Sequence, residues 1–161
     1  MTISLQSAVD LISNPRNLDV SVDEIFRLMV GGPCRRCWVP PAPEAESVTA
    51  VVGFGGILTG ACVLRCGKTA ACAIAAGMTG AHFDLVDDTV KDAIGEICNM
   101  IAGTWKGKVP ELAARCDLSV PAVITGCDYC LRVQAPEFTL RHLYAFNDVG
   151  FEVSILCDGL R

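Results

Sequence analysis

The residues between positions 87 and 106 alternate between apolar and polar with the period of an α-helix. One side of this predicted helix is apolar and carries Val90, Ile94, Ile97, Ile101 and Trp105. On the opposite side Asp92, Glu96 and Asn99 follow one another at helical spacing, and Gly103 continues the line. At about 1.5 Å per residue the helix is about 30 Å long. The pattern predicts that the apolar side packs on a core and the narrow polar side faces outward.

The rest of the chain alternates between helical and extended patterns. Helices are predicted at 21–30 and 68–78, and a hairpin at 47–54 and 58–66, which turns at Gly55-Gly56. Three further strands are predicted at 120–133, 139–147 and 150–156. This order indicates an α+β fold with helices over an antiparallel or mixed sheet. We expect one domain over residues 1–161, with a loosely ordered segment at 1–18 because the periodicity there is weak.

Composition and charge narrow the class of partner. The chain has 161 residues, of which 52% are hydrophobic and 19% charged, so we expect a globular protein. A formal net charge of −5 argues against nucleic acid or an anionic membrane surface as the main partner. No apolar run reaches the roughly 18 residues that span a bilayer, and the first residues do not resemble a signal peptide. We therefore expect a cytoplasmic protein.

Ten cysteines are many for such a chain, and four of them form two CxxC pairs. These are Cys34/Cys37 and Cys127/Cys130. Four thiolates bind zinc if the fold brings them together, and Arg35 beside the first pair favours a reactive thiol. Their separation of about 90 residues is far longer than in compact zinc modules, so we expect packing or surface thiols and no metal site. We expect turn or surface roles for His82 and His142, which are isolated in the sequence.

The polar side of the long helix allows two interpretations. It is either an ordinary solvated face or a surface that another molecule approaches across the low points left by Gly95 and Gly103. A short echo of the same helix occurs earlier, because Glu24-Ile25-Phe26-Arg27 resembles Glu96-Ile97-Cys98-Asn99. The echo indicates a duplicated half, although a match this short also arises by chance. The first copy has Arg27 where the second has Asn99.

The segment 92–103 (DAIGEICNMIAG), with Leu118-Ser119-Val120-Pro121 and Ile124-Thr125-Gly126 downstream, resembles the CheC/CheX/FliY phosphatases of bacterial chemotaxis, and most of all the CheX branch. The resemblance covers roughly residues 20 to 157. It implies one β-sheet with long helices on one face, and a homodimer. It also implies that the protein hydrolyses the aspartyl phosphate of a CheY-like response regulator, with Glu96 and Asn99 carrying the activity.

That chemistry suits these side chains. The receiver supplies its own divalent metal, so the phosphatase needs no cofactor and has mainly to place a water in line with phosphorus. The amide of Asn99 accepts from and donates to water without acting as a base. Glu96 is expected to pair with a cation of the receiver, Asp92 to add a second contact, and Gly95 and Gly103 to allow close approach. The alternative is a module that binds the receiver through the same face without turnover.

Overall fold

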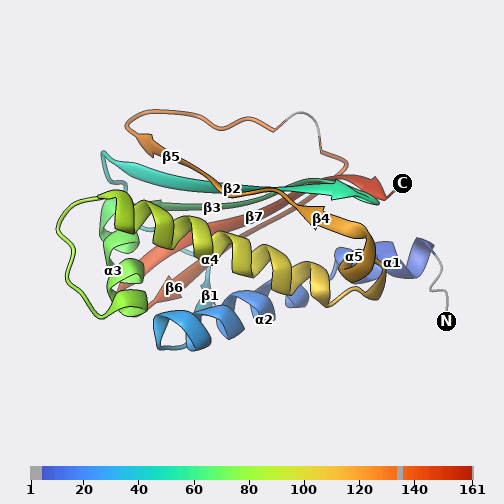
Figure 1. The fold of residues 1–161 in the computed structure, drawn as a ribbon, viewed down its shortest axis with the longest axis horizontal. Coiled ribbons are helices and arrows are strands. Elements are labelled where there is room, and N and C mark those ends of the chain that lie inside the picture. Colours follow the sequence, from blue (N-terminus) through green and yellow to red (C-terminus); the bar gives the residue numbers. More distant parts are fainter. Residues whose placement is uncertain (1–4, 134–135, 161) are drawn as a thin grey trace.

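A single β-sheet with helices gathered on one face makes up the fold (Figure 1). The computed structural model describes residues 5–133 and 136–160. The helices are α1 (Leu5–Ile12), α2 (Pro15–Ile25) with its π-helical continuation η1 (Phe26–Val30), α3 (Lys68–Thr79), α4 (Asp88–Gly107) and α5 (Pro110–Arg115). The strands are β1 (Arg35–Cys37), β2 (Ser47–Gly56), β3 (Leu58–Gly67), β4 (Cys116–Leu118), β5 (Ala122–Gly126), β6 (Phe138–Phe146) and β7 (Val149–Leu160).

The predicted α+β class is confirmed, and the strand pairs of the described chain are all antiparallel. Helices α3 and α4 and the first hairpin lie close to the predicted ranges, but α2 begins at Pro15, six residues before the predicted start at 21. Other parts of the prediction were wrong. Part of the segment 1–18 is helical and packed, since Ile12 and Leu18 are buried in the core. The strand predicted over 120–133 ends at Gly126, and β1, β4 and α5 were not predicted.

The sheet order is symmetric about its centre. It reads β1-β6-β7-β3-β2-β4, with β5 also paired to β2. The chain runs helix, short strand and hairpin twice: first α2, β1, β2 and β3, then α4, β4/β5, β6 and β7. If β1, β2 and β3 are exchanged with β4/β5, β6 and β7 respectively, the same strand order results, read in the opposite direction. The burial of the two helices matches as well, since Glu24 and Glu96 are exposed and the two residues after each are buried. The topology therefore supports the duplication that the sequence echo suggested.

Helix α4 lies against the middle of the core. The predicted apolar stripe from Val90 to Trp105 is fully buried, and the Trp105 ring packs at 5.4 Å from that of Phe54. The thiol of Cys98 donates to the carbonyl oxygens of Ala50 (3.6 Å) and Cys62 (3.5 Å), which ties the helix to β2 and β3. At its start the Asp87 carboxylate accepts a hydrogen bond from the amide of Val90 (2.9 Å), satisfying a free N–H of the first turn. These contacts fix the rotation of α4 and thus the direction of its polar side.

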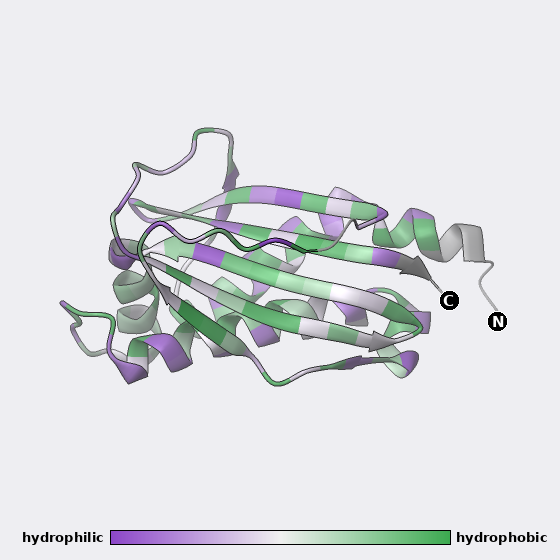
Figure 2. Cartoon of the chain, turned by 90° about the horizontal axis from the view of Figure 1, so that it is seen from above, coloured by the Kyte–Doolittle hydropathy of each residue, from purple (hydrophilic) through white to green (hydrophobic). Residues whose placement is uncertain are grey.

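The other face of the sheet is partly covered by the connection between β5 and β6, and Figure 2 shows the strands from that side with mixed apolar and polar colouring. The hydroxyl of Tyr129 is 2.5 Å from that of Thr49, and Arg65 lies over the Tyr129 ring. This anchor buries Thr49 on the outer face. Among the described residues, no helix combines the length and the apolar character that a membrane span requires.

Candidate functional site: the polar side of helix α4

Three polar residues of α4 project away from the sheet, as the sequence predicted. Asp92 and Glu96 are exposed, and Asn99 is partly exposed. None of these three side chains has a hydrogen bond or ion pair with another residue in the described part of the chain. The helix thus presents two carboxylates and one amide whose polar atoms are free for another molecule.

The half-burial of Asn99 follows from its position around the helix. At about 100° per residue, Asn99 is rotated by about 60° from Glu96. That rotation turns it toward the chain that links β4 and β5. A Cβ added to Gly95 would lie 3.2 Å from Val123 and 3.4 Å from Pro121, and one added to Gly103 would lie 3.7 Å from Leu118. Asn99 is midway between the two glycines, so one of its flanks faces this link.

The expectation that Gly95 faces a partner does not fit its surroundings. Gly95 is buried, and the close approach that it allows is that of Pro121 and Val123 in the same chain. The reason is that Gly95 lies further around the helix axis from Glu96 than Asn99 does, on the side that faces the edge strand. Gly103 is partly exposed and has only an ordinary contact with Leu118, so a place at the partner surface stays a prediction for Gly103.

The corresponding face of the first half is occupied by the chain's own ion pairs. Glu24 pairs with Lys108 at 3.2 Å, and Arg27 pairs with Asp23 at 2.8 Å. The Asp23 carboxylate also accepts a hydrogen bond from the backbone amide of Cys34 (2.9 Å). Because these groups already have partners, the two halves differ in chemistry, although Glu24 and Glu96 are both exposed. The free carboxylate and amide occur together on α4.

The two CxxC pairs lie at opposite edges of the sheet, since Cys34 directly precedes β1 and Cys37 is its last residue, whereas Cys127 and Cys130 follow β5. They are about five strand spacings of roughly 4.8 Å apart, which excludes one zinc ion shared by both pairs. No cluster of three or more potential metal ligands occurs among residues 5–133 and 136–160. Burial raises the pKa of most buried thiols, for example to about 12 at Cys66.

The two histidines have different surroundings. His82 is exposed, and its ring is 2.8 Å from Asp84. His142 is buried, contrary to the expected turn or surface position, and its Nδ1 lies 2.8 Å from the carboxylate of Asp19. The hydroxyl of Tyr144 donates to the same oxygen (2.7 Å), and burial raises the pKa of Tyr144 well above its usual range. This network joins α2 to β6 and lies away from α4's polar side.

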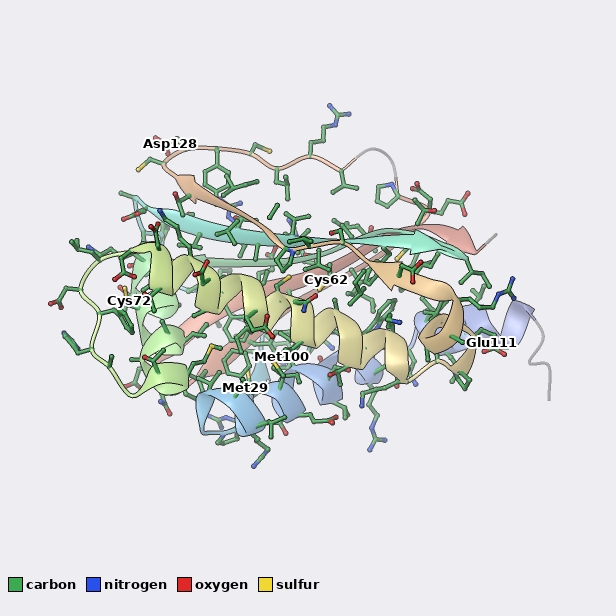
Figure 3. The ribbon with its side chains drawn as sticks, in the orientation of Figure 1. Met29, Cys62, Cys72, Met100, Glu111 and Asp128 are labelled. Carbon is green, nitrogen blue, oxygen red and sulfur yellow. The ribbon has the colours of Figure 1, made fainter. Side chains whose placement is uncertain are left out.

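The site formed by Asp92, Glu96 and Asn99 lies on the open surface of α4, and we call it the α4 ridge. Four cavities of about 240 to 310 Å³ lie elsewhere on the described chain, and none of these four is lined by Asp92, Glu96 or Asn99. Figure 3 shows α4 in front of the sheet, with Met100 on the side toward α2. A protruding helix with free polar groups suits the surface of another macromolecule better than a small molecule, which binds in a concave site.

The fold and this ridge define a class of protein: an α+β domain that exposes one helix face with a Glu-x-x-Asn motif. The model of the family named "Chemotaxis phosphatase CheX" matches residues 48–141. A relative from Thermotoga maritima, named CheY-P phosphatase CheX, is 31% identical over 112 residues, which are 68% of this chain and 71% of the relative. The chain belongs to the CheX family.

Solved structures share the fold. The chemotaxis protein CheX of Vibrio vulnificus superimposes with a TM-score of 0.74 at 19% identity, covering 88% of this chain and 94% of that one. CheX of Borrelia burgdorferi, whose structure is of a complex with CheY, BeF₃ and Mg²⁺, gives a TM-score of 0.66 at 21% identity, covering 88% and 96%. These likenesses extend the fold beyond the region that the family model matches.

Proposed function

We propose that this protein accelerates hydrolysis of the aspartyl phosphate of a CheY-like response regulator, in chemotaxis or a related two-component pathway. Family membership and the name of the Thermotoga maritima relative support the reaction class. The observation that carries the proposal for this chain is the state of Asn99: its amide is partly exposed on an open ridge and has no partner among the described residues.

Asn99 acts by orientation. The phosphoryl group of an acyl phosphate is already activated, and the receiver's own divalent metal stabilises its oxygens. The remaining barrier lies largely in placing a water in line with phosphorus. An amide oxygen accepts a hydrogen bond from that water, while the amide NH₂ donates to an oxygen nearby. The partial burial of Asn99 against the β4–β5 link limits its rotamers, which favours one fixed position for the water.

Glu96 binds the partner. A carboxylate placed against the phosphoryl oxygens would repel them, so Glu96 pairs with a cation beside the phosphorylated aspartate. Asp92 lies one turn earlier on the same line and adds a second acidic contact. Gly103 leaves the ridge low on the other side of Asn99 and lets the receiver approach the helix. The protein needs no cofactor of its own in this scheme.

The competing function is a module that holds the phosphorylated receiver without turnover. The test is to add catalytic amounts of the protein to a purified receiver, phosphorylated by a small acyl phosphate, and to measure release of inorganic phosphate. We expect many turnovers per molecule. Stoichiometric protection of the phosphorylated receiver, or no acceleration with several candidate receivers, would favour the binding module.

The homodimer implied by the resemblance remains part of the proposal. Light scattering on the purified protein measures it directly, with twice the mass of 17.1 kDa expected for a dimer.

A further inference from the structure

The edge strand beside α4 contains a one-residue bulge. In β4, Leu118 pairs with Phe54, and in β5, Ala122 pairs with Val51. Between these two pairs β2 contributes residues 52 and 53, whereas the edge strand contributes residues 119, 120 and 121. β4 and β5 are thus one strand interrupted by an extra residue. A bulge bends a strand and redirects its side chains, and bulges are frequent beside functional sites.

Ser119 holds the bulge in place. Its backbone amide donates to the Gly53 carbonyl oxygen (2.9 Å), and its hydroxyl oxygen accepts from the Gly53 amide (2.8 Å). The same hydroxyl donates to the carbonyl oxygen of Val120 (3.0 Å). Pro121, the last residue of the bulge, has no N–H that would need a partner. The bulge is therefore fixed from both sides and directs Val120 into solvent.

The bulge borders Asn99. Pro121 lies against Gly95 and Leu118 against Gly103, so the chain between them runs beside the stretch of α4 whose midpoint is Asn99. Val120 is 86% exposed, the most exposed of the large apolar residues whose side chains the structure describes. Because this apolar side chain is held in water beside the α4 ridge, its burial by a partner would stabilise the complex.

We propose that Val120 is an apolar contact for the phosphorylated receiver and that Ser119 is the positioning residue that holds it there. The proposal rests on the proposed function and adds the chemistry of the partner surface. The receiver should carry a basic group opposite Glu96 and an apolar patch on the other side of the phosphoaspartate, opposite Val120. The bulge adjoins the acidic α4 ridge, which favours the phosphorylated receiver as the molecule that covers Val120.

The test compares Val120→Asp and Val120→Ala with a matched control, Val39→Asp. Val39 is 78% exposed and follows β1 at the opposite edge of the sheet. Steady-state phosphate release gives kcat and KM for the phosphorylated receiver. If both methyl groups of Val120 are buried in the complex, Val120→Ala raises KM about tenfold. Val120→Asp raises it further through the desolvation of a charge, and Val39→Asp leaves both constants unchanged.

The outcomes separate this inference from the proposed function. If the unmodified protein turns over the receiver but both Val120 variants keep its KM, the contact proposed for Val120 is wrong and the phosphatase assignment stands. If the unmodified protein shows no turnover, the assignment itself fails. Should Val120→Asp fold poorly by circular dichroism, the Val120→Ala constants decide, because that variant removes two methyl groups from an exposed side chain.

Discussion

Gly95 and Gly103 make a matched pair in one helix, and changing each to alanine tests the packing that positions Asn99. Both lie in the interior of α4 with φ outside the left-handed region. Alanine therefore gains the full helix propensity at each site, about 1 kcal/mol relative to glycine. The difference lies in the neighbours of the added methyl group.

At Gly103 the new methyl meets Leu118 at 3.7 Å, an ordinary contact. Gly103→Ala should therefore stabilise the protein by about 1 kcal/mol, which raises Tm by about 2–4 °C for a chain of this size. At Gly95 the methyl meets Val123 at 3.2 Å and Pro121 at 3.4 Å, so the edge strand must move by a few tenths of an ångström. Overpacking of this kind costs about 1 kcal/mol. Gly95→Ala should therefore be close to neutral.

Thermal and urea unfolding of the two variants measure this difference, and phosphate release measures the effect on function. If Gly103 lies at the receiver surface, Gly103→Ala raises KM severalfold while it raises Tm. Gly95→Ala should instead lower kcat, since moving the β4–β5 link disturbs the flank of Asn99. Equal stabilisation by the two substitutions would refute the close packing of α4 on the edge strand. An unchanged KM for the more stable Gly103→Ala would remove Gly103 from the partner surface.

Three further outcomes follow from other contacts. Ser119→Ala should lower the free energy of unfolding by about 1 kcal/mol, because the Gly53 amide loses its side-chain acceptor, and Ser119→Thr should restore most of it; equal unfolding curves for all three proteins would contradict this role. Burial opposes ionisation of Asp23, but the hydrogen bonds from Arg27 and from the backbone hold the pKa of this carboxyl below its ordinary value. The contribution of Asp23 to the free energy of unfolding is therefore present above about pH 4 and is lost as the pH falls through the folded-state pKa. Asp23→Ala should therefore lower stability by about 1 kcal/mol at pH 7, and the difference from the unmodified protein should vanish in acid; a difference that persists there would contradict the linkage. The exposed or half-exposed thiols are those of Cys37, Cys127 and Cys130, and the other cysteines are buried. Titration with a thiol reagent should therefore give a fast phase from these three thiols and a slow phase, limited by unfolding, from the buried ones. Equal reaction rates for all thiols would contradict the burial of the other cysteines.

Much of the fold was predictable from periodicity. The long helix, α3 and the first hairpin have strong local patterns, and their observed limits lie within about two residues of the predicted ones. The edge strands β1 and β4 have three residues each and exist only through pairing with β6 and β2, which no local pattern indicates. The start of α2 was missed because Asn14 and Pro15 form its cap and first turn, a signal that weak periodicity obscured.

The site was predictable in part. Helical spacing was enough to place Asp92, Glu96 and Asn99 on one side of α4, because the opposite stripe is so apolar. Whether Gly95 meets a partner or the chain's own edge strand depends on the distant residues Pro121 and Val123, so the sequence pattern did not decide it. The bulge at Ser119–Pro121 was invisible for the same reason, since it is defined by the register against β2.

The most direct measurement for the central claim is single-turnover dephosphorylation of the receiver by Asn99→Ala, with Arg27→Ala as the control at the corresponding position of the first half. Asn99→Ala removes only the partly exposed amide, and Arg27→Ala breaks only an exposed ion pair, so both variants should fold. We predict that Asn99→Ala binds the phosphorylated receiver with nearly unchanged affinity and loses at least about a hundredfold in rate, the scale of a positioning contribution. Arg27→Ala should keep the full rate. A normal rate from Asn99→Ala would contradict the proposal that this amide positions the attacking water.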